Sequence, residues 1–319
     1  MKTFNSEKFF AGLLLLLLGL VPVYALQSGD TFSLNLFGRI LIFAIAASSL
    51  NLILGFGGMV SFGHALFLGL GSYVVGIMAH HGVSNGWAQL AATLVCCAVV
   101  GALTGALVLR TKGIAFIMIT LAFSQMFYFL FVSLKQYGGD DGLSITVKSD
   151  FSGLNLGNGV VFYYVCFGVL LLVLYAVRRI VDARFGMVLR GSKSNPVRMA
   201  AIGFPTLRYR LTAYVLSSMV CGVAGLLYAN LTMFSSPSYM SWIMSGDFII
   251  MVVLGGLGTV MGPVAGTVGL ILLEEILKAY TDKWMMVLGV LIVIIVSFTR
   301  RGLWGLVQDR QGKVRHEPA

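Results

Sequence analysis

Few side chains in this 319-residue sequence have the type and spacing that chemistry requires. The phosphate-binding pattern GxxxxGK followed by Ser or Thr does not occur, so we do not expect the chain to hydrolyse a nucleotide itself. The histidines and cysteines lack metal-ligand spacing; they are His64, His80, His81 and His316, and Cys96, Cys97, Cys166 and Cys221. The sequence therefore predicts a protein with no enzymatic activity of its own, no metal and no cofactor.

Polar side chains inside the apolar stretches are the remaining candidates for chemistry. They are Asn51, Ser61, Thr120, Ser124, Gln125, Asn230 and Asp247. An ionisable group inside a membrane is costly and usually functional, although Asp247 lies near the end of its stretch, where an interfacial position is the alternative. The sequence has no row of buried acids of the kind that a proton-driven pump needs. This favours an energy source outside the chain.

The elements that must position these residues are membrane helices. The chain is 58% hydrophobic and 11% charged, whereas soluble proteins carry about 25% charged residues. The formal net charge of +10 comes from Lys and Arg in the short stretches between apolar segments. That distribution is typical of the positive-inside rule, so it indicates membrane topology rather than a surface for nucleic acid.

The apolar segments predict the number of membrane passes. Long apolar runs occur at 9–26, 36–54, 60–79, 88–109, 114–134, 159–177, 211–233 and 284–299. A longer region, 241–277, is interrupted by glycines and is expected to form two short passes, with one pass and a re-entrant segment as the alternative. The run at 9–26 exceeds the apolar core of a signal peptide, so we expect a retained helix. We therefore predict an all-α integral membrane protein of about ten transmembrane helices, two of them broken by glycines, with an inverted five-helix repeat.

This organisation gives a single transmembrane domain over 1–319. Six spans occupy 9–177, a basic cytoplasmic segment follows at 178–210, four spans occupy 211–299, and 300–319 is a cytoplasmic tail. The positive-inside rule then places both termini in the cytoplasm and the loop 135–158 outside. That loop contains the sequence GGDDGL, which is typical either of a solvated turn or of a docking surface for an extracytoplasmic partner.

Two glycine clusters interrupt the apolar regions, one in each half of the chain. The first covers 55–63 after Asn51, and the second covers 255–263. Broken backbone at membrane depth needs a polar, protein-lined cavity, and paired breaks in two halves indicate a translocation path. The predicted path residues are Asn51, Gly57, Gly58, Ser61, His64, Gly255, Gly256 and Gly258. Close helix packing is the alternative for the glycines, and a hydrogen-bonded structural role is the alternative for His64.

A basic segment at 178–210 separates two apolar spans. It carries eight Lys and Arg residues against one acid, Asp182. Its middle reads RFGMVLRGSKSNPVRMAAIGFP, which predicts a short amphipathic helix that ends at Gly203 and Pro205. A charged helix in an apolar chain is a suitable contact for a soluble partner.

Five stretches, in this order along the chain, resemble the membrane permeases of branched-chain amino acid ABC importers, and within that family the M-type subunits. They are NLILGFGGMVSFGHALFLGLGSYV, GIAFIMITLAFSQMFYFL, GGDDGL, RFGMVLRGSKSNPVRMAAIGFPTLRYRLTAYVLSSMVCGVAGLLYA and GDFIIMVVLGGLGTVMGPVAGT. The resemblance extends over about 36–299. It implies a heterodimeric pore with a homologous permease subunit, two cytoplasmic ATPase subunits, a periplasmic substrate-binding protein and a bacterial inner-membrane location.

The resemblance also implies that a coupling helix in the basic segment docks on the ATPase. The positions that match are Arg190, Asn195, Arg198, Ala200, Ala201 and Gly203. The sequence departs from the family at two points: Pro196 stands where relatives usually carry an acid, and Val197 to Met199 lack the glutamate of the general coupling motif. Because proline is favoured in the first turn of a helix, the coupling helix is expected to begin at Pro196.

Two other classes of protein agree less well with the sequence than an ABC permease does. A stand-alone secondary transporter is disfavoured by the lack of buried charge pairs, and a membrane enzyme would need a catalytic cluster at one membrane face. Within the permease class, urea, short amides and other amino acids are the alternative substrates.

Overall fold

The computed structural model describes residues 6–28, 31–151, 156–298 and 302–305. The helices in this part of the chain are α1 (Ser6–Ser28), α2 (Thr31–Asn51), α3 (Ala65–His80), α4 (Gly86–Val108), α5 (Ile114–Ser133), α6 (Gly159–Asp182), α7 (Arg184–Ser194), α8 (Pro196–Ala201), α9 (Thr206–Thr232), α10 (Trp242–Gly255), α11 (Gly262–Tyr280) and α12 (Trp284–Phe298). A π-helical turn, η1 (Leu52–Phe56), continues α2, and short 3₁₀ turns are η2 (Lys135–Tyr137), η3 (Gly139–Asp141) and η4 (Pro237–Met240).

Helices form almost the whole described structure. The exception is a two-stranded antiparallel ladder, in which β1 (Leu143–Ser144) pairs with β2 (Phe234–Ser235). Six helical segments are long and apolar enough to cross a membrane: α1, α2 with η1, α4, α5, α6 and α9. The helices α3, α10 and α12 are apolar but shorter. The prediction of an all-α membrane protein is therefore confirmed.

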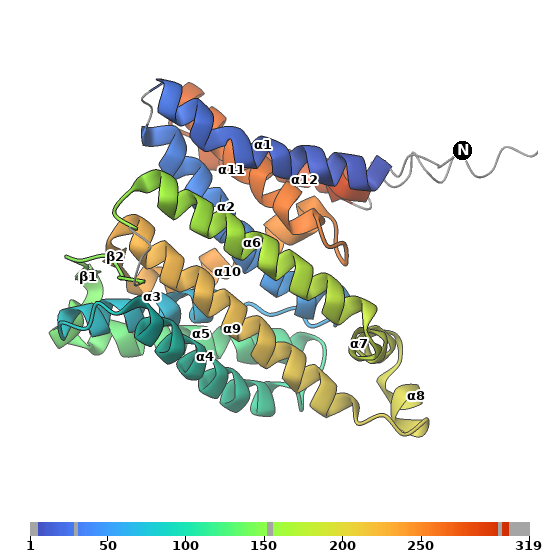
Figure 1. Ribbon diagram of the computed structural model, residues 1–319. Coiled ribbons are helices and arrows are strands. Elements are labelled where there is room, and N and C mark those ends of the chain that lie inside the picture. Colours follow the sequence, from blue (N-terminus) through green and yellow to red (C-terminus); the bar gives the residue numbers. More distant parts are fainter. Residues whose placement is uncertain (1–5, 29–30, 152–155, 299–301, 306–319) are drawn as a thin grey trace, which may run out of the picture.

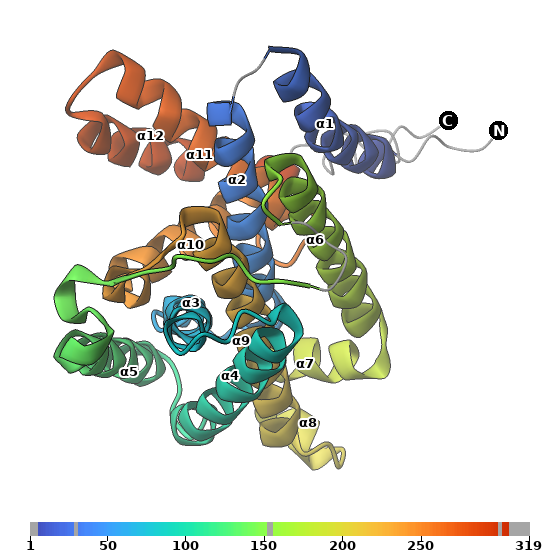
Figure 2. The same ribbon diagram turned by 60° about the vertical axis from the view of Figure 1, so that its left-hand side comes forward.

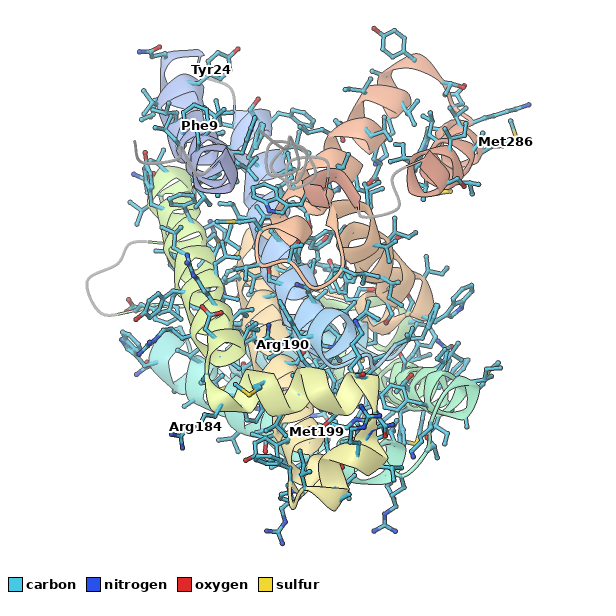
Figure 3. All side chains as sticks on the ribbon, turned by 90° about the vertical axis from the view of Figure 1, so that its right-hand side faces the viewer. Phe9, Tyr24, Arg184, Arg190, Met199 and Met286 are labelled. Carbon is cyan, nitrogen blue, oxygen red and sulfur yellow. The ribbon has the colours of Figure 1, made fainter. Side chains whose placement is uncertain are left out.

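Helix α2 lies at the centre of the bundle, with α6, α9 and α11 around it (Figure 2). Every residue from Ile40 to Asn51 is buried. The outer helices show the opposite pattern, because large apolar side chains on α1, α4, α5 and α12 are exposed. Tyr24 and Met286 lie on this outer surface (Figure 3). Exposed apolar surface of this extent suits contact with lipid or with another membrane subunit.

Small residues let the inner helices approach one another closely. A Cβ atom at Gly71 of α3 would collide with the backbone of Gly222 in α9, and one at Gly225 would collide with the backbone of Leu68. Packing through small residues is the usual basis of helix association in membranes. This close packing holds α3, the helix that follows the first glycine break, against α9.

The basic segment forms two helices rather than one. The expected single amphipathic helix over 184–203 is interrupted at Asn195, whose backbone is extended (φ −153°, ψ 99°). The Asn195 side chain caps α8 by accepting a hydrogen bond from the Arg198 N–H at 2.9 Å, and Pro196 occupies the first turn of α8. The expected start of the coupling helix at Pro196 is therefore confirmed, and residues 184–194 form a separate helix before it.

Helices α7 and α8 lie at one end of the molecule, opposite the β1–β2 ladder (Figure 1). Helix α1 also begins at the α7–α8 end. Most of the predicted tail 300–319 lies outside the described residues. Its described part, 302–305, packs against the second glycine break, since a Cβ atom at Gly302 would lie 2.5 Å from the Gly256 backbone.

Candidate functional site

The first glycine break ends the long helix made by α2 and η1. The Gly58 N–H donates to Leu54 O at 3.1 Å, and the Met59 N–H donates to Ile53 O at 2.9 Å. Gly58 has φ +68°, a conformation that glycine adopts without strain. The Met59 N–H thus reaches a carbonyl six residues back, and the positive φ of Gly58 folds the chain over the end of the helix. The first cluster is therefore a helix stop at the α7–α8 end of the molecule, followed by an irregular stretch that leads into α3.

The second glycine break is a tight turn between α10 and α11. The Thr259 hydroxyl donates to Gly256 O at 2.8 Å and accepts from the Gly262 N–H at 3.1 Å. Pro263 then lies in the first turn of α11. The threonine side chain thus satisfies backbone groups that the break would otherwise leave unpaired.

The two breaks, about 200 residues apart in the sequence, meet in space. The Asn51 side chain donates from Nδ2 to Thr259 O at 2.7 Å, and its Oδ1 accepts from the Gly258 N–H at 3.1 Å. A Cβ atom at Gly55 would lie 2.5 Å from Gly258 N, so the two backbones are in direct contact. Asn51 is only 1% exposed, whereas its partners Gly258 and Thr259 are half-buried and line a cavity. One amide side chain joins the two predicted halves of the path.

Ser61 and His64 lie in the protein interior. Both are fully buried, and Ser61 accepts a hydrogen bond from the Gly63 N–H. His64 Nε2 lies 2.8 Å from Ser49 Oγ, and that hydroxyl donates its only proton to Ala46 O. His64 Nε2 must therefore carry a proton and donate to Ser49. These contacts are those of a structural histidine that anchors the start of α3.

Two cavities flank the junction of the breaks at the α7–α8 end. The larger has a volume of about 590 Å³ and is lined by residues including Phe56, Arg178, Arg190, Gly258, Thr259 and Trp304. The smaller has a volume of about 350 Å³ and is lined by residues including Gly57, Gly58, Lys112, Lys193, Pro196 and Arg210. Of the predicted path residues, Gly57, Gly58 and Gly258 face these cavities, whereas Gly255 and Gly256 pack against α11 and Gly302.

Five of the six predicted coupling residues lie on or beside α8 and are exposed. They are Asn195, Arg198, Ala200, Ala201 and Gly203. Exposed apolar side chains surround them, with Val197 at 71% and Ile202 at 64% exposure. Gly203 has φ +92° and turns the chain back toward α9. Helix α8 lies at the edge of the molecule (Figure 1), and its exposed residues include small and apolar ones.

Arg190 has a different position from the other predicted coupling residues. Its Nη2 donates to Val181 O at 3.2 Å and its Nε donates to Gly186 O at 3.3 Å. The guanidinium therefore holds the start of α7 against the end of α6. Figure 3 shows Arg190 on α7, which lies across the end of the bundle, with α8 and Met199 beyond it.

Sequence reasoning missed Lys193 and Thr259. Lys193 Nζ donates to Gly55 O at 2.8 Å, which joins α7 to the first break. The sequence shows Lys193 only as one of many charges in a basic segment, and nothing local points from position 193 to position 55. Among the described residues, no group of three or more His, Cys, Asp or Glu side chains is close enough together to hold a metal ion.

Replacing Gly58 with alanine is expected to destabilise the protein, because a Cβ atom there would lie 2.7 Å from Lys193 Cγ and φ is positive. The backbone strain alone costs about 1–2 kcal/mol. Gly82→Ala is a matched control, since Gly82 has φ +77° but no atom within 4 Å of the added Cβ. Thermal unfolding in detergent should show a larger fall for Gly58→Ala. Equal shifts would contradict the close contact with Lys193.

The long apolar helices and the contact between the two glycine breaks identify a multi-pass, all-α membrane protein. The chain belongs to the family of permease components of branched-chain amino acid transport systems, whose family model matches residues 32–296.

Curated relatives support this assignment over most of the chain. The LivM permease protein of the high-affinity branched-chain amino acid transport system of Salmonella typhimurium is 24% identical over 307 residues, covering 88% of this chain and 72% of the relative. The Escherichia coli LivM protein is 25% identical over 287 residues, covering 82% and 68%. A probable LivM permease of Methanocaldococcus jannaschii is 23% identical over 326 residues, covering 85% and 94%.

No solved structure matches the chain. The relatives are transport permeases and not enzymes, which confirms the expectation that this chain has no enzymatic activity of its own.

Proposed function

We propose that this chain is the permease subunit of an ABC importer that moves branched-chain amino acids across the inner membrane. Two partner ATPase subunits would drive it, a homologous permease would complete the pore, and a periplasmic binding protein would deliver the substrate. The observation that carries the proposal is the family match over 32–296, together with a short helix, α8, that projects small and apolar groups outside the membrane bundle.

Helix α8 is the proposed docking site for the ATPase. Small side chains at Ala200 and Ala201 allow a partner groove to approach the helix backbone closely. Exposed Val197 and Ile202 supply apolar surface that is costly in water unless a partner covers it. Arg190 is proposed to act at the base of this site, where it fixes α7 on α6.

The proposed topology has ten passes with both termini in the cytoplasm. The six long helices supply six passes, the shorter apolar helices α3, α10 and α12 supply three, and the 19-residue α11 supplies the tenth. The basic α7–α8 segment and the start of α1 lie at the same end of the molecule, as this topology requires (Figure 1). The acidic stretch at 138–143 lies beside the β1–β2 ladder at the opposite end, which is proposed to face the binding protein.

The proposed inverted five-helix repeat does not relate the two helix–glycine–helix units, α2–α3 and α10–α11, to each other. Both units turn at the same end of the molecule, where their breaks touch, whereas inverted halves would place equivalent turns at opposite ends. In a five-plus-five division the first unit contains the second and third passes, and the second unit contains the third and fourth passes of its half. The direct contact of the two breaks at Gly55 and Gly258 supports a shared role in the path.

The test is reconstitution with ATPase subunits, a second permease and the binding protein from the same organism. We expect uptake of radiolabelled leucine, isoleucine or valine into vesicles that depends on ATP and on all partners. Uptake without the ATPases would instead indicate a stand-alone secondary transporter. Binding of urea, a short amide or another amino acid by the partner binding protein would reassign the substrate and leave the mechanism unchanged.

A further inference from the structure

Lys193 connects the α7–α8 segment to the membrane core. Its Nζ donates a 2.8 Å hydrogen bond to the backbone carbonyl of Gly55, across 138 positions of sequence. None of the ion pairs among the described residues includes Lys193. The ammonium group is thus held by a helix end and not by an acidic side chain.

The contact has a clear physical cause in the way that the α2–η1 helix ends. The last carbonyls of a helix have no partners within it, and the backbone bonds from Gly58 and Met59 use only Leu54 O and Ile53 O. The Gly55 carbonyl remains available, at the end of the helix where the macrodipole attracts a cation. Gly58 lacks a side chain at the point where Lys193 Cγ passes, so the lysine stem can reach it.

The same lysine completes a continuous series of contacts from α8 to the second break. Met199 of α8 packs on α7 at Gly191, where a Cβ atom would lie 2.7 Å from the Met199 sulfur. Lys193, two residues further on α7, binds Gly55. Gly55 touches Gly258, and Asn51 ties the same helix end to Gly258 and Thr259. One side chain, Lys193, thus lies between the α7–α8 segment and both breaks.

We propose that Lys193 is the positioning residue that couples movement of α8 to the paired glycine breaks. The inference rests on the proposed function, because it takes α8 as the ATPase docking site. The hydrogen bond to Gly55 is the link: when α7 shifts with α8, Lys193 carries the end of the α2–η1 helix with it, and Asn51 transmits the shift to 258–259.

The test compares Lys193→Met with Lys193→Arg in the complete transporter. Methionine keeps an apolar stem beside Gly58 but cannot donate, whereas arginine keeps a cationic donor. Hydrogen bonds from charged donors are among the strong ones, so we expect uptake by Lys193→Met to fall about tenfold or more. ATPase subunits should still co-purify, and ATP hydrolysis per amino acid imported should rise. Arg184→Met, an exposed arginine at the other end of α7, is the matched control and should behave as wild type.

Each outcome decides the proposal. Normal uptake and normal ATP use by Lys193→Met would overturn it, as would loss of ATPase association, which would make Lys193 a docking residue. Failure of the wild-type complex to need ATPases would instead overturn the proposed function. If Lys193→Met does not fold, hydrogen exchange in the wild-type complex serves as the second measurement. Exchange at 52–60 should differ between nucleotide-trapped and nucleotide-free complexes, and identical exchange would contradict the coupling.

Discussion

Replacing Ala201 with arginine is expected to abolish ATP-dependent uptake while the permease still folds and inserts. Ala201 is exposed at the end of α8, so the new side chain meets no part of this chain. An ATPase groove that fits α8 would instead have to bury an unpaired guanidinium, which costs about 3–5 kcal/mol. That corresponds to a loss of affinity of at least about 100-fold. Co-purification of the ATPase subunits and uptake into vesicles are the measurements.

The control for this prediction is the same substitution at Ala183, which is also exposed but lies before α7. Ala183→Arg should retain ATPase binding and uptake. If both variants lose ATPase association, added positive charge near the membrane explains the effect and α8 is not the docking site. Gly203→Glu is a less informative variant, because φ +92° means that any side chain there also strains the turn.

The helices of this protein are largely predictable from its sequence. Apolar runs of membrane-spanning length identify α1, α2, α4, α5, α6 and α9, because each must satisfy its backbone hydrogen bonds internally. The start of α8 can also be predicted from neighbouring residues, since Asn195 caps the helix and Pro196 occupies its first turn. The division of 184–203 into two helices follows from the same pair of residues. The start at Pro196 is expected from this pair, whereas the separate helix over 184–194 is not.

The arrangement of the candidate site cannot be predicted from the sequence around each residue, because its contacts join distant segments of the chain. Gly55 and Gly258 are each visible as members of a glycine cluster, but their contact depends on how α10 and α11 pack against α2. The same holds for Lys193, whose partner is a backbone carbonyl and therefore leaves no complementary residue in the sequence. For His64, the sequence marks an uncommon residue beside a break but does not show its hydrogen-bond partner Ser49, which lies 15 positions earlier in α2.

Replacing Asn51 with leucine is expected to lower both the stability of the protein and its transport rate. Leucine has a similar size but cannot bond, so the half-buried Gly258 N–H and Thr259 carbonyl lose their side-chain partner. Each lost hydrogen bond costs about 0.5–1.5 kcal/mol. Thermal unfolding in detergent measures the stability, and uptake per folded transporter measures the effect on function.

Asn230→Leu separates the two effects. Asn230 is equally buried in α9, where its Oδ1 accepts from the Ser149 N–H at 2.8 Å and its Nδ2 donates to Leu226 O at 2.9 Å. It lies far from both breaks along the chain, close to the β1–β2 ladder, which is opposite the α7–α8 end. Both substitutions should therefore lower thermal stability, but only Asn51→Leu should slow uptake per folded transporter. Equal slowing by the two variants would mean that lost stability alone explains the transport defect, and the junction of the breaks would have no special part in translocation.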